Sequence, residues 1–279
     1  MTSPYSTHGL PRPTTPEGRA GLAALLHDPG GALVALDYDG TLSPIVSDPR
    51  AASAHQGAAA VLQRLGGRIG TLAVITGRPA AAAADLGGFH SVSGLVILGH
   101  YGFERWESGV VTAPPPPPGV AAARVDLPAV LADAGAPAGT WVEDKGHSLA
   151  VHTRRAADPD GALAILRAPL AALADRVGLA VEPGRMVIEL RPAGMDKGVA
   201  LKNLAAERLS RAILFCGDDL GDLPAFAAVR ELRSSGIPGL AVCSGSTEVA
   251  ALAEASDLVV DGPAGVMTLL AGLADMLGG

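Results

Sequence analysis

The chain has 279 residues, of which 48% are hydrophobic and only 3% aromatic, and its formal net charge is −7. This length suits one large domain, or a core with one inserted domain. The acidic balance, without a cluster of lysine and arginine, disfavours nucleic acid as a partner, and every long apolar stretch is interrupted before the roughly 20 residues that a membrane span needs.

The first part of the chain predicts a tail followed by an alternation of strands and helices. Residues 1–20 contain proline, threonine and scattered charge but no apolar signal core, so we expect a flexible N-terminal tail, with a short helix over 17–27. The runs that follow are apolar on both faces, which is typical of buried parallel strands. The strands predicted here are Ala32–Leu36, Thr71–Ile75 and Leu95–Leu98, and the helices are 54–65 and Ala80–Leu86.

The pattern changes after residue 110. Pro114 to Pro118 form a stiff extended spacer, and the strands beyond it alternate apolar and polar residues, which indicates a sheet with one solvated face. The elements predicted in this segment are helices 120–134 and 159–177 and strands Thr140–Lys145, Ser148–Thr153, Leu179–Val181 and Met186–Leu190, with a turn at Pro183-Gly184.

The first pattern then resumes and continues to the end of the chain. The predicted elements are helices 197–208, 222–229, 247–254 and 263–277 and strands Ala212–Cys216, Leu240–Val242 and Leu258–Val260. Strands alternating with helices indicate a parallel sheet covered on both faces. The sequence therefore predicts an α/β core of residues 21–112 and 194–279, interrupted by an inserted α+β domain of residues 113–193.

Two acids follow the first predicted strand. Asp37 and Asp39 lie at its carboxyl end, where ligands bind in open α/β sheets, and Gly40 lets the backbone turn there. A spacing of two tends to place both side chains on one side of an extended chain. Two interpretations stay open: carboxylates held around a proton or cation, or strand-end acids that cap a helix.

Further acids follow the predicted strand Ala212–Cys216. Asp218, Asp219 and Asp222 stand within five residues, which is unfavourable for packing but suits a hard cation. Asp222 can alternatively be the N-cap of the next helix, because Pro224 stands in its first turn.

Two residues could bind an anion. Thr76 follows the strand Thr71–Ile75, so its hydroxyl and the next amides could hold an anion at a helix N-terminus; alone, it would be a plain N-cap. Lys197 stands at the start of a predicted helix, where a positive charge opposes the helix dipole. This local cost favours a role in binding an anion.

These four elements, in this order, resemble the haloacid dehalogenase superfamily of phosphatases. The resemblance extends to trehalose-6-phosphate phosphatases, and its discriminating parts are EDK and the segment ELRPAGMDKG. It implies a Rossmann-like parallel-sheet core with an inserted α+β cap domain. The matching segments, which lie between residues 33 and 226, are DYDGTLSPIVSDP, ITGRP, GHYGFE, WVEDKGHSLAVHTR, IELRPAGMDKG and FCGDDLGDLPAF.

The resemblance implies a covalent mechanism for hydrolysis of trehalose 6-phosphate, the last step of trehalose biosynthesis. Asp37 would attack phosphorus and form an aspartyl-phosphate. Asp39 would protonate the departing sugar oxygen and then activate water. Thr76 and Lys197 would hold phosphate oxygens.

The resemblance also implies Mg²⁺ as cofactor. The Asp37 carboxylate, the Asp39 backbone carbonyl and the Asp218 carboxylate would bind it, and Asp219 and Asp222 would support these ligands. Mg²⁺ would offset the repulsion between a carboxylate nucleophile and a phosphate that carries nearly two negative charges.

The substrate-binding residues implied by the resemblance are Arg78 in the core and three charged residues of the insertion. Glu143 and Lys145 alternate along one predicted strand, and Glu189 projects from another. Resemblance assigns the insertion residues to the sugar hydroxyls of trehalose. The spacing itself equally fits an ordinary cross-strand ion pair on a solvated sheet.

The sequence departs from the family in two places. Gly221 stands where many relatives have threonine, and Leu223-Pro224 replaces a more acidic pair, so the surroundings of the metal are less certain than its main ligands. Tyr101 occupies a position that is more often His or Asn, and the sequence assigns it no role.

The same residues permit some alternative functions and disfavour others. The core motifs also permit a related phosphatase for sucrose phosphate or mannosyl-3-phosphoglycerate. A non-catalytic sugar-phosphate sensor is disfavoured because every proposed catalytic aspartate and Lys197 are present. Dinucleotide and P-loop sites lack their glycine motifs, G-x-G-x-x-G and G-x-x-x-x-G-K-[ST].

The remaining expectations concern the environment of the protein. Cys216 and Cys243 lie in apolar segments and are expected to be buried free thiols, which suits a reducing cytoplasm. The expected partner is a small sugar phosphate, without nucleic acid or membrane, and the protein is expected to act as a monomer.

Overall fold

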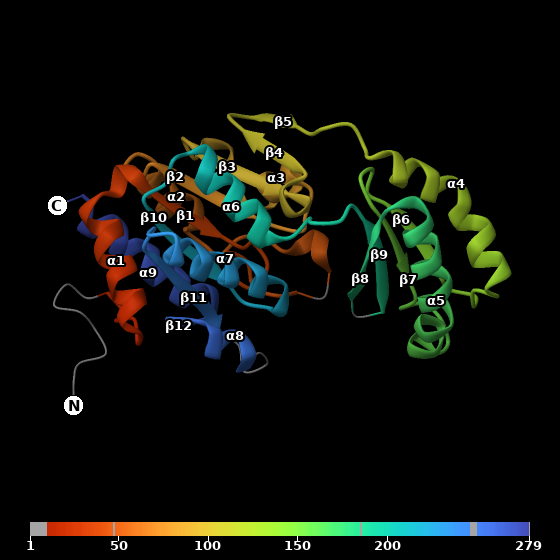
Figure 1. Ribbon diagram of the computed structural model, residues 1–279. Coiled ribbons are helices and arrows are strands. Elements are labelled where there is room, and N and C mark those ends of the chain that lie inside the picture. Colours follow the sequence, from red (N-terminus) through yellow and green to blue (C-terminus); the bar gives the residue numbers. More distant parts are fainter. Residues whose placement is uncertain (1–9, 47, 185, 246–249, 279) are drawn as a thin grey trace. The chain divides into compact units, whose positions relative to one another are not determined.

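The computed structural model describes residues 10–46, 48–184, 186–245 and 250–278 (Figure 1). The chain divides into two compact units. The core unit comprises residues up to Ala113 and from Asp196 onward, and the inserted unit comprises Pro114–Met195. The predicted limits of the insertion were 113 and 193.

The core unit is built on an eight-stranded sheet with the order β12-β11-β10-β1-β2-β3-β4-β5. The strands from β12 to β3 pair in parallel, whereas β4 and β5 add an antiparallel edge. The bounds are β1 Ala32–Leu36, β2 Thr71–Ile75, β3 Leu95–Gly99, β4 Glu104–Glu107, β5 Val110–Thr112, β10 Ala212–Gly217, β11 Gly239–Gly245 and β12 Leu258–Asp261.

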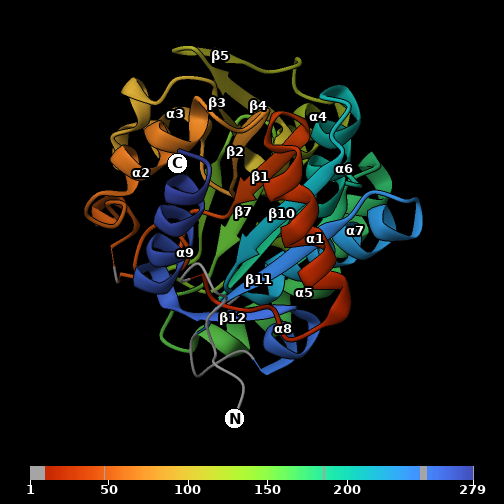
Figure 2. The same cartoon turned by 90° about the vertical axis from the view of Figure 1, so that its left-hand side faces the viewer.

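Helices cover both faces of this sheet. Residues of α1, α2, α3 and α9 join one buried cluster, and residues of α6, α7 and α8 join another; Figure 2 shows α2 and α9 on the opposite side of the sheet from α6 and α7. The bounds are α1 Pro16–His27, α2 Ala58–Gly66, α3 Ala80–Gly87, α6 Lys197–Glu207, α7 Leu223–Ser234, α8 Ala250–Ala255 and α9 Gly262–Met276. Short 3-10 helices are η1 Pro29–Gly31, η2 Pro49–Ala51, η3 Phe89–Ser91, η4 His100–Gly102 and η5 Leu220–Asp222.

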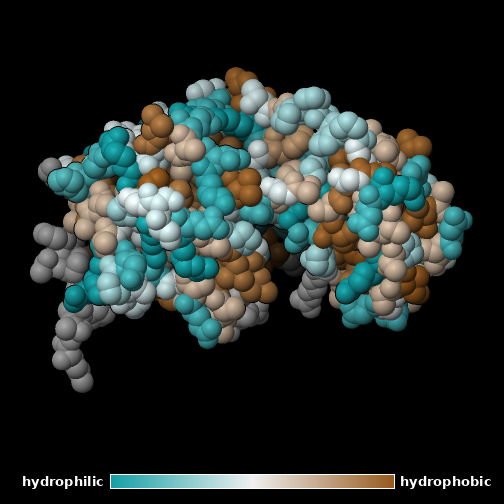
Figure 3. All heavy atoms as spheres, viewed as in Figure 1, coloured by the Kyte–Doolittle hydropathy of each residue, from teal (hydrophilic) through white to brown (hydrophobic). Residues whose placement is uncertain are grey.

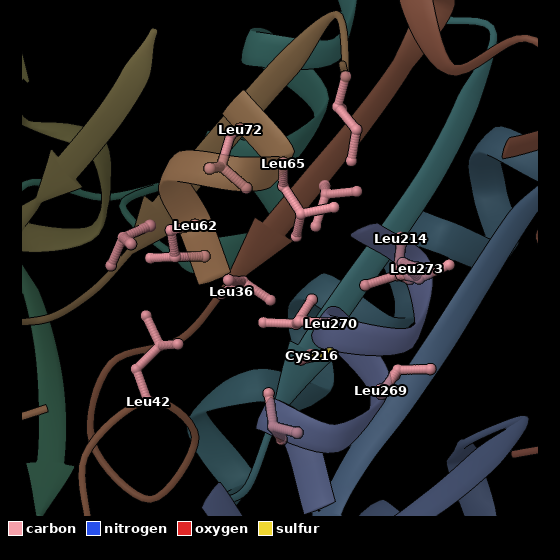
Figure 4. Close-up of a cluster of buried hydrophobic side chains, with 14 of the residues drawn as sticks. Leu36, Leu42, Leu62, Leu65, Leu72, Leu214, Cys216, Leu269, Leu270 and Leu273 are labelled. Atoms are coloured by element: carbon pink, nitrogen blue, oxygen red, sulfur yellow. The ribbon is translucent and has the colours of Figure 1, made fainter. Parts of the chain in front are cut away.

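The two clusters explain why β1 is apolar throughout. Leu33 and Ala35 pack with the cluster of α6 and α7, and the alternate residues pack on the other face. Figure 4 shows one of these, Leu36, beside Leu62 of α2 and Leu270 of α9. A strand buried on both faces has no polar position, so its sequence reads as a continuous apolar run.

The described N-terminal residues correct the predicted tail of residues 1–20. The Thr15 hydroxyl accepts a hydrogen bond from the amide of Gly18 at 3.0 Å, and α1 begins with Pro16, so the helix has a regular start inside the predicted tail. Leu10 is also buried, at 1% exposure. Residues 1–9 lie outside the described residues.

The inserted unit packs two helices on one face of an antiparallel sheet. The sheet order is β6-β7-β9-β8, and its helix-covered side chains form a separate buried cluster. The bounds are α4 Pro118–Asp133, α5 Pro159–Val177, β6 Trp141–Asp144, β7 Leu149–His152, β8 Ala180–Gly184 and β9 Val187–Arg191. Most apolar side chains of these strands face the helices and most polar ones face away, which agrees with the alternation predicted from the sequence.

Two prolines of the inserted unit, Pro118 and Pro183, lie where their missing amide is tolerated. Pro118 of the proline run is the first residue of α4. The turn predicted at Pro183-Gly184 is wrong, because both residues belong to β8. β8 lies at an edge of the sheet, where a proline breaks no ladder hydrogen bond on the open side.

The described surface and helices can be compared with the requirements of a membrane-spanning helix. In Figure 3, hydrophilic residues are interspersed with apolar ones over the helices α6 and α7. None of the described helices combines the length and apolar character required to traverse a bilayer.

Candidate active site

Three neighbouring parallel strands deliver the predicted residues to one edge of the core sheet. β1 lies between β10 and β2, and Leu36 pairs with Cys216 and with Val74 (Figure 2). Asp37, Asp218 and Thr76 immediately follow these three strands. Because the strands run in the same direction, all three residues lie at their carboxyl ends, as the apolar runs predicted.

A buried lysine joins this group from α6. The Lys197 ammonium lies 2.7 Å from Asp37 Oδ1 and 2.7 Å from Asp222 Oδ1. Its side chain is only 7% exposed. Burial alone would lower the pKa of Lys197, but Asp37 and Asp222 raise it well above its usual value, so the lysine stays charged.

The group has more negative than positive charge. Oxygens of Asp37, Asp218 and Asp222 all lie within 4.8 Å of one another, and the adjoining Lys197 supplies one positive charge. Burial, followed by repulsion from Asp219 and Asp222, raises the pKa of Asp218 to about 7. A divalent cation would remove this repulsion, and carboxylate oxygens are the ligands that hard cations prefer, so the cluster fits a metal.

Within the cluster, Asp222 already has several protein donors. Its Oδ1 accepts from Lys197, and its Oδ2 accepts from the amides of Asp218 at 2.9 Å and Asp219 at 3.2 Å. Asp222 therefore orients Lys197 and the turn after β10. Asp37 and Asp218 are the carboxylates better suited to hold a cation directly.

Gly40 makes room for Asp218. Its φ is +72°, which favours glycine, and an added Cβ would lie 1.9 Å from Asp218 Oδ2. Ser244, at the end of β11, donates a hydrogen bond to the Gly40 carbonyl at 2.7 Å. Ser244 was not identified from the sequence, because only the sheet order brings β11 near this turn.

Asp219 and Gly221 form a small turn beside the cluster. The Asp219 side chain accepts from the Gly221 amide at 2.8 Å and caps η5. An added Cβ on Gly221 would approach Asp219 Oδ1 at 3.0 Å. A side chain such as threonine at position 221 would therefore press against the oxygen that caps η5.

Asp39 lies outside the carboxylate cluster and is paired with Arg78. Arg78 Nε donates to Asp39 Oδ2 at 2.7 Å, and its terminal nitrogen donates to Oδ1 at 2.6 Å. Arg78 also donates to the Pro49 carbonyl at 2.7 Å and lies over the Tyr38 ring. Two parallel hydrogen bonds are the arrangement that an ionised carboxylate makes with a guanidinium.

The Thr76 turn differs from the sequence expectation in one respect. Thr76 is buried, and its hydroxyl accepts from the Arg78 amide at 3.1 Å. The first amide of α3, at Ala80, donates to Glu104 Oε2 at 2.9 Å. Glu104 thus occupies one amide of this helix end, and the anion site at the N-terminus of α3 stays a prediction. Glu104 was missed because no strand was predicted over residues 104–107.

The charged residues of the inserted unit contact one another on the face of the sheet opposite its helices. Lys145 Nζ lies 2.8 Å from Glu189 Oε2, which is the cross-strand ion pair that the spacing allowed. Ser148 Oγ donates to the other Glu189 oxygen at 2.6 Å. Burial would raise the pKa of Glu189, but Lys145 and Ser148 lower it overall.

Glu143 is also held within this sheet. His152 Nε2 lies 2.9 Å from Glu143 Oε2, and the His152 ring stacks on Trp141 with centroids 4.0 Å apart. Trp141 and His152 are directly paired across the strands β6 and β7. The sequence identified Glu143, Lys145 and Glu189 but not the side chains that orient them.

The sequence of the chain is similar to proteins of one family. A family model described as Trehalose-phosphatase matches residues 35–260. A trehalose-phosphate phosphatase from Mycobacterium marinum is 34% identical over 260 residues, covering 88% of this chain and 62% of the relative. An uncharacterized glycosyl hydrolase from Mycobacterium tuberculosis is 39% identical over 215 residues, covering 71% of this chain but only 15% of that protein.

A solved structure extends the similarity to the fold. The trehalose-6-phosphate phosphatase from Aspergillus fumigatus matches with a TM-score of 0.69 and 23% identity, covering 94% of this chain and 98% of that one. The chain spans 62% of the length of the Mycobacterium marinum relative.

Proposed function

Because the chain belongs to the trehalose-phosphatase family, we propose that it hydrolyses trehalose 6-phosphate to trehalose and inorganic phosphate. The observation that carries this proposal is the buried group at the strand ends, where Asp37 contacts Lys197 within a cluster of carboxylates. A carboxylate can attack a phosphate only where positive charge offsets the repulsion between them.

In the first step, an Asp37 oxygen forms a bond to phosphorus while the bond from phosphorus to the sugar oxygen breaks. Asp39 transfers its proton to the departing oxygen, and trehalose leaves. Thr76 and Lys197 hold the phosphoryl oxygens. Lys197 is already aligned for this role because it lies 2.7 Å from Asp37.

In the second step, water attacks the aspartyl-phosphate and Asp39 accepts its proton. Phosphate leaves, and Asp37 is regenerated. The paired geometry of Arg78 and Asp39 represents the ionised form of Asp39, which is the form that accepts this proton. We propose that Arg78 alternates between this pair and the substrate, so that a protonated Asp39 can serve the first step.

Mg²⁺ is the proposed metal. Asp37 and Asp218 would hold it together with the Asp39 carbonyl, and when bound it would supply positive charge to the phosphoryl group. Asp222 would keep Lys197 in place, consistent with its hydrogen bond of 2.7 Å to the ammonium. Asp219 would support the turn.

The inserted unit is proposed to select the sugar, as a cap domain. Lys145 and Glu189 would exchange their ion pair, and Glu143 its contact with His152, for hydroxyls of trehalose. The family relation and the polarity of the sheet face that carries these residues support the assignment.

A panel of phosphate esters would test the substrate. The expected result is a kcat/KM for trehalose 6-phosphate at least about tenfold above those for sucrose phosphate and mannosyl-3-phosphoglycerate. A tenfold preference for either competitor would refute the proposed substrate while leaving a phosphatase in place.

A cytoplasmic location and action as a monomer complete the proposal. Cys216 and Cys243 are both free and buried, which suits a reducing compartment.

A further inference from the structure

The segment after β3 has an unusual backbone. His100 and Tyr101 in η4 have φ of +49° and +58°, and Gly102 follows with φ of +96°. A left-handed conformation is unfavourable for residues that carry a Cβ, and two such residues in succession persist only where surrounding contacts enforce them. Such strain commonly accompanies a functional turn.

Backbone hydrogen bonds connect this segment to the Thr76 turn. The Tyr101 amide donates to the Thr76 carbonyl at 2.9 Å, and the His100 amide donates to the Arg78 carbonyl at 2.9 Å. The Thr76 amide in turn donates to the Leu98 carbonyl at 3.0 Å. The conformation of η4 therefore fixes the path of residues 76–78, and with it the position of the Thr76 hydroxyl, which keeps its own hydrogen to donate to an anion.

The Tyr101 side chain adds a contact that depends on glycine. A Cβ added to Gly77 would lie 2.8 Å from Tyr101 Oη and 2.9 Å from Cζ. The end of the phenol ring thus covers Gly77, the residue between Thr76 and Arg78. Gly77 is not among the residues with positive φ, so its backbone would accept alanine and only the ring excludes a side chain there.

We propose that Tyr101 is a positioning residue for phosphate: its ring packs on Gly77 and fixes the Thr76 turn in the form that binds the phosphoryl group. The inference rests on the proposed phosphatase function. It assigns a role to a tyrosine that the sequence alone left without one.

Inorganic phosphate, the product, is the probe that tests the proposal. Tyr101→Gly removes the ring and also relieves the backbone strain, so a purely structural role predicts a change in melting temperature without a specific loss of affinity. We expect Tyr101→Gly to bind phosphate about tenfold more weakly by calorimetry in the presence of Mg²⁺, with a cooperative melting transition retained. Tyr101→Phe keeps the ring and should stay within about threefold of the unmodified protein.

A reciprocal variant tests the contact itself. Gly77→Ala should weaken phosphate binding because its Cβ meets the phenol, and the loss in the double variant with Tyr101→Gly should be smaller than the two single losses combined. Independent effects of the two changes, or phosphate affinity of Tyr101→Gly equal to that of the unmodified protein, would overturn the proposal. Unmodified protein that binds phosphate but hydrolyses no sugar phosphate would refute the function and leave the positioning role standing.

Discussion

At the scale of single residues, Lys197 shows why the site needs a further positive charge. Its ammonium contacts Asp37 and Asp222, both nearly fully buried. Burial, with repulsion from Asp222 and Asp218, still raises the pKa of Asp37 well above its usual value, and a protonated carboxyl could not attack phosphorus. Lys197 therefore offsets only one negative charge, and a divalent cation would favour the ionised form of the nucleophile.

The nucleophile assignment predicts the effect of Asp37→Asn. The amide cannot form the covalent intermediate, so turnover should fall by at least about a thousandfold, whereas the fold should remain because one buried negative charge is removed. Phosphate release and circular dichroism measure the two effects. Asp85→Asn, an exposed acid of α3, is the control and should keep full activity. Near-normal turnover of Asp37→Asn would refute the assignment.

The pairing of Asp39 with Arg78 predicts that lysine cannot replace this arginine. Arg78→Lys keeps the charge but loses the two parallel hydrogen bonds of 2.6 and 2.7 Å. We expect kcat to fall about tenfold or more, because Asp39 loses its orientation. A variant that changes KM alone would show that Arg78 only binds substrate.

The pKa of Asp218 predicts a pH-dependent response to Mg²⁺. Its folded pKa of about 7 exceeds its ordinary value of 3.8, so the metal-free folded state binds more protons between these values and loses stability as pH rises through that window. Mg²⁺ needs the ionised carboxylate and offsets its cost, so the increase in Tm on adding Mg²⁺ should be larger near pH 8 than near pH 6.

Melting curves of the unmodified protein and of Asp218→Asn provide the measurement. The variant should show a small response to Mg²⁺ at both pH values. An equal response of the unmodified protein at both values would contradict the proposed role of Asp218 as a metal ligand.

At the scale of elements, the sequence predicts strand ends better than contacts between elements. The runs before Asp37, Thr76 and Asp218 are apolar because both faces of their strands are buried, so their carboxyl ends could be placed directly. The strand β4 was missed because it is short and mostly charged, and β5 because it has only three residues, all exposed. Their contribution to the site, Glu104 on the amide of Ala80, therefore had no signal.

Pairings that depend on tertiary structure were equally hidden. Asp39 and Arg78 were each assigned a role from the family resemblance, but their mutual ion pair follows from the juxtaposition of two loops. The same holds for Ser148 on Glu189, which joins neighbouring strands of the inserted sheet. Sequence spacing reports the face of one strand and does not identify the neighbour across it.

The inserted sheet supports a prediction about specificity. Glu189→Ala should lower kcat/KM for trehalose 6-phosphate far more than for a small ester such as p-nitrophenyl phosphate, because the small ester has no sugar to bind. Glu182→Ala is the matched control, since Glu182 pairs with Glu189 across β8 and β9 but bonds to Arg191. Equal losses for both esters would show that Glu189 does not contact the sugar.

At the scale of the whole molecule, the chain combines two units with separate hydrophobic cores. The core unit carries every residue proposed for chemistry, and the inserted unit carries the polar sheet face proposed for sugar recognition. This division explains why the aspartate motifs alone indicate only a phosphatase, whereas the proposed substrate rests on the insertion and on the family.

Release of orthophosphate from trehalose 6-phosphate by the purified protein tests the central claim most directly. The account predicts rapid release with Mg²⁺, no release with EDTA and recovery when Mg²⁺ is restored, because the carboxylate cluster requires a cation to admit the phosphate. A folded sample that liberates no orthophosphate with Mg²⁺, or one that is equally active in EDTA, would contradict it.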